Sequence, residues 1–390
     1  MTSSDVTFDT VIVRFGGEIG IKAAWTRKWY ERRLIINFKA ALKHHAIPYT
    51  EFVRKFGRLF VKTLQAQEAA EKLAKVFGVS SLSPASEISS DLNDILNASV
   101  SLASSRFRKE KTFAVRCRRV GKHPYTSQDV CRLIGQSILS GFPERHLQVD
   151  LTNPDQTVHI EIREHKAYVF TDIIKGVGGL PLGTQPKLIC LLNADELSAA
   201  ACWMTMKRGS PALFVYFENG ASIDKFNLER TIRSAQKLMD WAIGYPRRLH
   251  VIECGQIFQR LAQEHSSELS NVLCKRLMLR IAQRIAENEA AEGILAGGML
   301  GKKGSQTLHA LRIQEEAVQG YPIYRPLIGL DINEIEEIAQ RIGLEKSMLP
   351  ELEEAPKTTL GLEEIREIEK ELNINKMVED ALKSLKTLQV

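Results

Sequence analysis

Apolar and polar positions follow short, separate patterns through the first part of the chain. Residues 7–15 alternate and are rich in β-branched side chains, which predicts a strand that ends at a pair of glycines. Residues 25–42 carry apolar side chains at close to helical spacing and predict a helix. A strand at residues 57–64 and a helix at residues 67–76 complete a compact β-α-β-α unit.

A second small α/β unit is indicated between residues 80 and 184. We predict its strands at residues 112–120, 157–164 and 166–174. A helix is predicted at residues 127–139, because Thr126 and Ser127 supply the hydroxyl groups that typically mark a helix start.

The pattern changes after residues 175–185, which hold four glycines and a proline and therefore mark a junction. Beyond this segment, continuous apolar runs alternate with helical ones, a pattern typical of a parallel sheet covered on both faces. We predict strands at residues 187–192, 212–217, 248–254 and 293–296, and helices at residues 198–209, 228–242 and 273–290. The second half is thus predicted to be a doubly wound α/β domain.

Asp331 and Glu334 have the spacing of a capping box, and acidic helical segments are predicted over residues 362–385. The six cysteines are scattered singly, without a C-x-x-C pair. Neither a structural metal nor a disulfide is therefore expected.

The composition, 44% hydrophobic and 26% charged over 390 residues, is that of a globular chain with two or three domains. The start lacks the basic and apolar regions of a leader peptide, and no run approaches the ~18 apolar residues of a membrane span. We expect a cytoplasmic protein that binds no membrane.

Positive charge is concentrated in the first half. Residues 1–185 hold 27 Lys and Arg against 18 Asp and Glu, a net +9, whereas residues 186–390 hold 26 against 29, a net −3. Residues 101–125 alone carry eight basic side chains and one acid, Glu110. Such a run suits a polyanion, because phosphate neutralisation releases counterions; the alternative is a solvated basic face.

Four segments of the first half carry motifs in a fixed order. The first, GGEIGIKAAWTRKWYERRLIINFKAAL (residues 16–42), contains Gly17, Glu18, Ile19 and Lys22 in a G-E-I-x-x-K pattern. The others are residues 111–130, 149–170 and 175–185. Together they resemble the tRNA 4-thiouridine sulfurtransferase (ThiI) family.

The resemblance implies a ferredoxin-like domain followed by a THUMP domain, which in the family together hold the acceptor end of tRNA. On a strand, Arg116 and Arg118 share one face while Arg119 begins the turn, so their guanidinium groups suit phosphate contacts. No base-edge readout, and no binding of DNA, is expected. The residues expected to contact RNA are Arg106, Arg108, Lys111, Arg116, Arg118, Arg119, Lys122, His123 and Lys175. For Gly178 and Gly179, close approach to a ligand and an interdomain hinge both remain open.

The second half resembles the PP-loop domain of the same family, in the short form without a rhodanese domain. The matching segments are residues 191–209, 273–287, 296–313 and 321–335. An intact family loop reads S-G-G-x-D-S and cradles the pyrophosphate of ATP. In register, this chain has Asn193, Ala194, Asp195, Glu196, Leu197 and Ser198, and only the last serine matches.

These changes argue against a nucleotide at the loop. A carboxylate ~4 Å from a phosphate costs about 4 kcal/mol at an effective dielectric constant of ~20. Asp195 and Ser198 then serve as caps of the alanine-rich helix. The later family motif is represented by residues 296–307, where the family's acid is lost but Gly297 and Ser305-Gln306-Thr307 remain. Lys302 and Lys303 in this loop are able to pair with Asp195 and Glu196 or to contact RNA, and the sequence does not separate the two.

The resemblance also implies a cysteine that carries sulfur, in a segment like P-E-Y-C. The matching stretch here is residues 350–353, and the cysteine position is Glu353. We therefore expect no catalytic residue, with Leu197 and Glu353 as the degenerate positions, and no cofactor. ATP with Mg²⁺ is expected only if the loop works in a variant form.

We predict four segments: a ferredoxin-like domain at residues 1–78, a THUMP domain at 79–175, a linker at 176–186 and a degenerate PP-loop domain at 187–390. The hypothesis is a non-catalytic tRNA-binding protein of tRNA modification, a homodimer with a possible protein partner. The alternative is an active ATP-dependent 4-thiouridine synthase, which the family also links to thiamine thiazole sulfur. A third possibility is a scaffold that has lost RNA binding.

Overall fold

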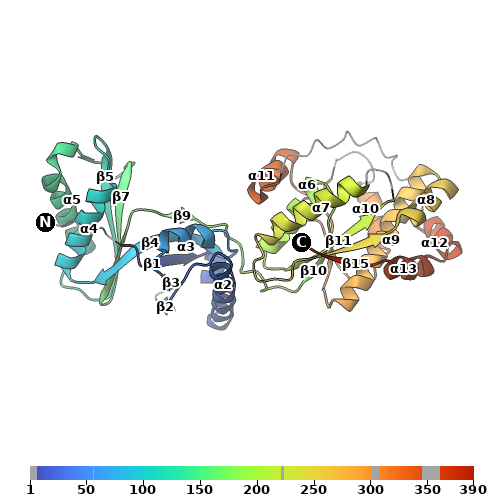
Figure 1. Ribbon diagram of the computed structural model, residues 1–390, viewed down its shortest axis with the longest axis horizontal. Coiled ribbons are helices and arrows are strands. Elements are labelled where there is room, and N and C mark those ends of the chain that lie inside the picture. Colours follow the sequence, from blue (N-terminus) through green and yellow to red (C-terminus); the bar gives the residue numbers. More distant parts are fainter. Residues whose placement is uncertain (1–6, 56, 221–223, 301–306, 345–360) are drawn as a thin grey trace. The chain divides into compact units, whose positions relative to one another are not determined.

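The computed structural model describes residues 7–55, 57–220, 224–300, 307–344 and 361–390. The chain forms two compact units, Met1–Leu180 and Pro181–Val390, and each is described by itself (Figure 1). The predicted combination of small α/β domains with a doubly wound parallel sheet is confirmed.

The first unit is built on one continuous sheet. Its strands are β1 (Thr10–Phe15), β2 (Phe52–Lys55), β3 (Arg58–Lys62), β4 (Val79–Ser89), β5 (Thr112–Val120), β6 (Gln148–Val149), β7 (Gln156–Arg163), β8 (Lys166–Phe170) and β9 (Ile174–Lys175). The order is β2-β3-β1-β4-β8-β7-β5-β6, with β9 paired to β4. The predicted bounds of β5 are confirmed residue for residue; its first half is buried on both faces at Phe113, Ala114 and Val115, and only its second half alternates.

Strand β4 joins the two halves of this sheet. Its first part pairs with β1, from Val79 to Ala85, and its last four residues pair with β8. The sheet also curls, since Phe60 of β3 stacks on Tyr168 of β8 with ring centroids 4.6 Å apart, although β1 and β4 lie between those strands. The two halves therefore share one core, formed by Ile12, Phe60, Ala85, Tyr168 and Phe170.

The helices of the first unit pack on the sheet in two groups (Figure 1). They are α1 (Gly17–Gly20), α2 (Ala24–His44), α3 (Ala66–Leu73), α4 (Leu92–Arg106) and α5 (Ser127–Gly141), with a short 3₁₀ turn, Pro143–Arg145. Helix α3 packs on β1 and β4, and α4 and α5 pack on β8 and β5. The predicted start of α5 is confirmed, because Thr126 forms a capping box with Asp129.

The glycine-rich segment near residue 178 packs on the backbone of the first unit. Gly176 N–H donates to Ser80 O at 2.8 Å, and Gly178 N–H donates to Val79 O at 2.7 Å. A Cβ atom at Gly176 would lie 2.3 Å from Val79 O, so only glycine fits there. Gly178 and Gly179 have φ values of 73° and 78°, a left-handed conformation that glycine adopts without strain.

The second unit is a doubly wound sheet. Its strands are β10 (Leu188–Leu191), β11 (Ala212–Glu218), β12 (Arg248–Glu253), β13 (Ile294–Leu295), β14 (Ile323–Tyr324) and β15 (Lys386–Gln389). The order is β14-β13-β10-β11-β12-β15, and all pairs are parallel except that of β15 with β12. The chain order reverses between β10 and β13, which makes the carboxyl ends of these two strands the usual ligand position in such folds.

Helices cover both faces of this sheet (Figure 1). They are α6 (Glu196–Lys207), α7 (Asp224–Met239), α8 (Gly255–Glu264), α9 (Ser267–Asn288), α10 (Leu308–Glu315), α11 (Ile332–Ile342), α12 (Leu362–Glu371) and α13 (Ile374–Lys383). The capping box predicted at Asp331 and Glu334 is present at the start of α11. No helix within the described ranges combines the length and apolar character needed to cross a membrane.

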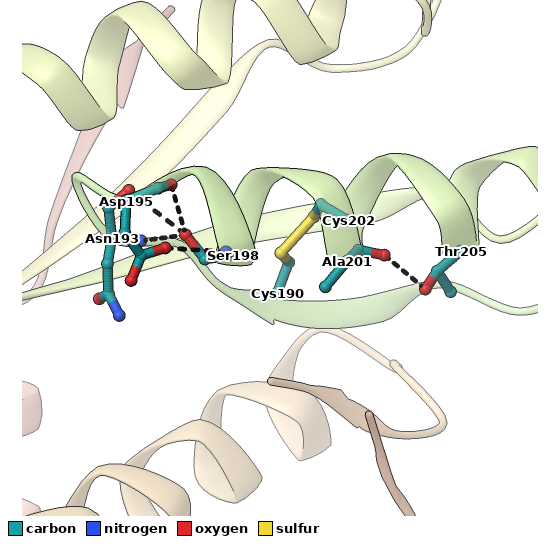
Figure 2. Close-up of a disulfide and its surroundings, with 7 residues drawn as sticks. All are labelled: Cys190, Asn193, Asp195, Ser198, Ala201, Cys202 and Thr205. Carbon is teal, nitrogen blue, oxygen red and sulfur yellow. Dashed lines mark hydrogen bonds between the residues drawn. A yellow bond between two sulfur atoms is a disulfide. The ribbon is translucent and has the colours of Figure 1, made fainter. Parts of the chain in front are cut away.

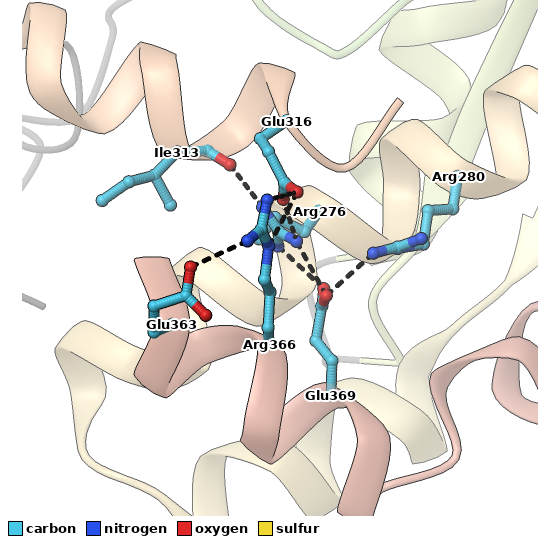
Figure 3. Close-up of polar contacts among 7 residues, drawn as sticks. All are labelled: Arg276, Arg280, Ile313, Glu316, Glu363, Arg366 and Glu369. Carbon is cyan, nitrogen blue, oxygen red and sulfur yellow. Dashed lines mark hydrogen bonds and ion pairs between the residues drawn. The ribbon is translucent and has the colours of Figure 1, made fainter. Parts of the chain in front are cut away.

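The acidic tail packs within the second unit. Ile365 of α12 and Met377 and Val378 of α13 belong to the same core as α9. Arg276 of α9, fully buried, donates to both carboxylate oxygens of Glu369 at 2.8 and 2.7 Å and to Glu316 at 2.9 Å (Figure 3). The predicted tail helices are thus confirmed, with their apolar faces covered by the chain itself.

The expectation that the cysteines form no disulfide is wrong. Cys190 of β10 and Cys202 of α6 are joined, with Cα atoms 6.4 Å apart (Figure 2). The cause is local, because α6 follows β10 after a short loop and packs back on it, which brings together two residues twelve positions apart. Cys202 is a core residue, as its apolar helix pattern predicted.

Candidate functional site

Strand β5 presents two arginines to solvent. Arg116 and Arg118 are exposed and share a face, as predicted from strand periodicity. The prediction that Arg119 begins the turn is wrong, because β5 continues to Val120 and Arg119 points to the opposite face. There its guanidinium lies 3.4 Å from Gly121 O and 3.5 Å from His123 Nδ1.

The predicted RNA-binding residues fall into separate groups. Arg106, Arg108 and Lys111 lie before β5, while Lys122 and His123 lie beyond its other end. A nine-residue strand spans roughly 27 Å, so one phosphate cannot contact both groups. Lys175, on β9, is exposed and pairs through its backbone with Ser81 of β4, away from β5. The basic residues are thus spread along the unit, as suits contacts to several phosphates.

An open cleft lies beyond the end of β5. Its lining includes Lys122, His123, Tyr125, Glu164 and His165. The rings of His123 and Tyr125 stack with centroids 5.5 Å apart, and His123 Nε2 lies 2.7 Å from Glu164 O. A cation beside stacked rings is the combination that favours an unstacked nucleotide.

A buried charge cluster on the same sheet was not predicted. Glu161 of β7 accepts from Arg14 of β1 and Arg163 at 2.8 and 2.9 Å, and Arg58 of β3 lies 3.9 Å away. Burial alone would raise the pKa of Glu161, but the hydrogen bond from Arg163 and the charges of Arg14 and Arg58 outweigh it and lower the pKa. Glu161 and Arg14 are 147 positions apart, so no local sequence pattern joins them.

The loop after β10 is closed by its own side chains (Figure 2). Asp195 is the N-cap of α6 and accepts from Ser198 N–H at 2.8 Å. Ser198 Oγ accepts from Asn193 N–H at 3.0 Å. The predicted capping role of Asp195 agrees with this geometry. The backbone N–H groups of Asn193 and Ser198 are therefore both occupied by side chains of the loop.

Leu197 and Gly297 complete the packing of this loop. Leu197 is buried, with 4% of its surface exposed, and belongs to the hydrophobic core. A Cβ atom at Gly297 would lie 2.7 Å from both Cα and N of Ser198. The segment after β13 thus rests directly on the first turn of α6, and Gly297 allows that approach.

A pocket lies beside this loop, at the carboxyl ends of β10, β13 and β14. Asn193, Asp195, Ser198 and Gly297 line it together with Lys275 of α9 and Arg325, which follows β14. Burial lowers the pKa of Lys275 to about 8, and the charge of Arg325 adds to the effect. Sequence analysis missed both cations, although each lies in a segment that resembles the family.

The described thiols are poorly suited to sulfur chemistry. Burial raises the pKa of Cys117 and of Cys254 to about 12 and that of Cys274 to about 11, and also raises the pKa of Cys131. A thiol with so high a pKa holds little thiolate at neutral pH. Cys190 and Cys202 are joined to each other.

Glu353, Lys302 and Lys303 lie outside the described residues. Within the described ranges, no cluster of three His, Cys, Asp or Glu could hold a metal ion.

Models of three protein families match successive parts of the chain. A ferredoxin-like domain model of ThiI matches residues 10–83, a THUMP domain model matches 89–172, and "Thiamine biosynthesis protein (ThiI)" matches 183–374.

Curated relatives span nearly the whole chain. A "Probable tRNA sulfurtransferase" of Methanosarcina acetivorans is 36% identical over 98% of this chain and 94% of its own length. One of Thermococcus kodakarensis is 37% identical over 88% of this chain and 90% of its own. A solved structure, "Crystal structure of a 4-thiouridine synthetase - RNA complex with bound ATP", superposes with a TM-score of 0.85 at 26% identity, covering 98% of this chain and 99% of that one.

Proposed function

Because the chain belongs to the ThiI family of tRNA sulfurtransferases, we propose that it binds tRNA through its first unit and does not itself carry out ATP-dependent sulfur transfer. The basic run of residues 101–125, the exposed Arg116 and Arg118 and the match to a THUMP domain support the binding of the acceptor end of tRNA. Phosphate contacts rather than base edges would then provide most of the affinity.

The proposed loss of catalysis rests on one observation, the closed loop of residues 193–198. Its Asn193 and Ser198 N–H groups donate to side chains of the loop, and Asp195 places a carboxylate on the pocket wall. The position of the family's aspartate is held by Leu197, a core residue. The raised pKa values of the free thiols also support the proposed loss of sulfur transfer.

The alternative, an active ATP-dependent tRNA 4-thiouridine synthase with a variant loop, is favoured by one specific observation. A pocket lies where the strand order of the sheet reverses, and two cationic side chains, Lys275 and Arg325, line it. Calorimetry with Mg-ATP separates the two functions. We expect no detectable heat of binding, and a micromolar dissociation constant would support the enzyme.

Binding of tRNA is tested by reversing the charges on β5. Arg116→Glu with Arg118→Glu should weaken binding at least about tenfold at low salt, because each lost charge-assisted contact is worth about 1.5–3 kcal/mol. The slope of log affinity against log salt should fall by about 1 for each lost phosphate contact. Filter binding with unmodified tRNA measures both quantities.

A matched control reverses two exposed charges on helices, Lys39→Glu with Arg132→Glu. It changes the net charge of the protein equally and should reduce tRNA affinity much less. Equal losses in the two double variants would mean that only the overall charge matters. Unchanged binding in the β5 variant would make this strand a solvated face.

We further propose the division into residues 1–78, 79–175, 176–186 and 187–390, a cytoplasmic location and a homodimer. A protein of tRNA modification is the proposed partner of this dimer. Sedimentation equilibrium of the full chain tests the dimer, since a monomer mass across the concentration range contradicts it.

A further inference from the structure

Helix α2 exposes three large apolar side chains on its outer face. Trp25 is 78% exposed, Ile36 53% and Trp29 36%. At helical spacing these positions form one row, on the side of the helix opposite the buried Leu34 and Phe38. Single exposed apolar side chains are common on protein surfaces, whereas two tryptophans and an isoleucine in one row indicate a contact surface.

The same row is positively charged. Lys28, Arg32 and Lys39 are exposed among the apolar side chains, and among the described residues none of these three cations has a carboxylate at ion-pair distance. The single acid of α2, Glu31, is mostly buried and lies 4.0 Å from Arg27. A helix face that stays in water usually mixes both signs of charge, which this one does not. We call this row the α2 stripe; it consists of Trp25, Lys28, Trp29, Arg32, Ile36 and Lys39.

Helix α2 covers the face of the sheet opposite to the arginines proposed to bind RNA. Phe38 of α2 contacts Phe52 of β2, with ring centroids 6.4 Å apart, while the next residue, Val53, packs on the shared core of the first unit. Adjacent residues of a strand face opposite sides, so α2 covers the side away from this core. On β5, Arg116 is level with His159 of β7, which stacks on a ring of the same core. The α2 stripe is therefore a separate surface from the β5 arginines.

The residue types of the stripe suit a protein partner. Tryptophan and arginine are the side chains that most often dominate the binding energy of protein interfaces. Ile36 has no aromatic face on which a nucleic acid base could stack, whereas an aliphatic side chain packs equally well on tryptophan and on isoleucine. The cations between them favour carboxylates. At ~1.5 Å for each residue, the stripe is about 21 Å long, which matches about four turns of a helix.

We propose that the α2 stripe binds an acidic amphipathic helix of a partner protein. The apolar side chains of that helix pack on Trp25, Trp29 and Ile36, and its carboxylates pair with the three cations of the stripe. Anchors at helical spacing are the usual means by which proteins recognise such helices. The proposal goes beyond the proposed function, since it requires neither tRNA binding nor the loss of the nucleotide site.

Fluorescence anisotropy with a labelled synthetic peptide tests this proposal on the full chain. The probe is a helix of about 18 residues, long enough to be partly helical in water, with leucine at every third or fourth position and glutamate and alanine elsewhere. It should bind with a micromolar dissociation constant. A peptide with lysine in place of every glutamate should bind at least about tenfold more weakly, because like charges then meet at the stripe.

Two variants of the stripe locate the binding. Trp25→Ala, and Lys28→Glu combined with Arg32→Glu, should each weaken binding of the acidic peptide by at least about tenfold. Neither variant should change the affinity for unmodified tRNA by more than about twofold, because α2 and the β5 arginines lie on opposite faces of the sheet.

Matched controls replace exposed side chains elsewhere in the same unit. Leu139→Ala removes an exposed apolar side chain of α5, and Lys109→Glu with Arg132→Glu reverses two exposed charges. Both controls should bind the acidic peptide nearly as the wild type does. A loss in the charge control as large as that in the stripe variant would overturn the proposal, because overall charge would then explain the binding.

Three other results would also overturn the proposal: no binding of the acidic peptide, equal affinity for the acidic and the basic peptide, or wild-type affinity in both stripe variants. A loss of tRNA affinity in Trp25→Ala as large as its loss of peptide affinity would make the stripe an RNA surface instead. Binding to vesicles of phosphatidylcholine and phosphatidylserine, lost in the stripe variants, would make it a membrane contact. If circular dichroism shows that one stripe variant does not fold, the other variant decides the question.

Discussion

Each unit holds a cluster of arginine and glutamate side chains around a buried ion pair, but the two residue types occur in different proportions. In the first unit, one carboxylate, Glu161, is surrounded by Arg14, Arg58 and Arg163. In the second, Arg276, Arg280 and Arg366 are balanced by three glutamates, Glu316, Glu363 and Glu369 (Figure 3). The first cluster carries a net +2 and the second is neutral.

This difference shows how each unit uses its charges. The neutral cluster ties α12 to α9 and to the end of α10, so its main effect is to fix the tail on the domain. The positive cluster ties β1 and β3 to β7 and leaves positive charge in the unit proposed to bind RNA. A buried carboxylate here holds the arginines in place without cancelling their field.

The largest expected effect concerns the neutral cluster. Arg276→Met should reduce the free energy of unfolding by about 3–5 kcal/mol, because it leaves Glu369, which is 4% exposed, with only part of its charge compensated. Urea denaturation followed by circular dichroism measures the loss. Arg366→Met removes another partner of Glu316 at an exposed position and should leave stability nearly unchanged. Equal effects of the two variants would show that burial does not matter in this cluster.

A smaller effect is expected from Glu161→Gln in the first unit. The side chain keeps its shape but loses the charge that compensates three arginines, which should cost up to about 3 kcal/mol near neutral pH. Because the pKa of Glu161 in the folded protein is lowered from 4.5, its contribution is present above that value and is lost as the pH falls through the folded pKa.

The stability difference between wild type and Glu161→Gln should therefore shrink below about pH 4.5. Thermal melts of both proteins at values between about pH 3 and about pH 7 measure this stability difference on both sides of the ordinary carboxyl pKa. Glu164→Gln, on an exposed turn, serves as the control. A difference that does not depend on pH would mean that packing, rather than charge, explains the role of Glu161.

The smallest effect is expected at the closed loop. Asp195→Ala removes the N-cap of α6 and should cost about 1 kcal/mol, whereas Asp195→Asn keeps an oxygen acceptor and should cost less. Chemical denaturation measures both changes. If Asp195→Ala instead kept its stability and gained ATP binding, the carboxylate would act mainly to repel phosphate and not as a cap.

Sequence patterns predicted elements whose apolar side chains face one core. Strand β5, rich in apolar residues in its first half and alternating in its second, was predicted residue for residue, and the capping residues of α5 and α11 were recognised. Strand β4 was missed because it is built largely of serine, alanine and proline, with Val79 and Leu82 as its buried larger apolar side chains. Its strand structure depends on pairing with β1 and β8, which local sequence does not reveal.

The candidate sites depend even more than the strands on contacts that the local sequence does not reveal. The loop of residues 193–198 was recognised because its residues are consecutive, and its capping followed from helix chemistry. Arg325 and Lys275 were missed because they meet only after β14 and α9 are placed beside β10. Likewise, Arg276 and Glu369 are 93 positions apart, and a helical arginine was not expected to be fully buried.

Strand β4 also limits where the chain of the first unit can be cut. The match to the ferredoxin-like domain model ends at residue 83, and the match to the THUMP domain model begins at residue 89. Both positions lie within this one strand. Cutting the chain before β4 would remove the partner of β1 and expose its backbone N–H and C=O groups as a sheet edge, which favours aggregation. A chimaera that takes only one of the two domains from a relative must therefore also include a strand in the place of β4, because β1 and β8 both pair with it.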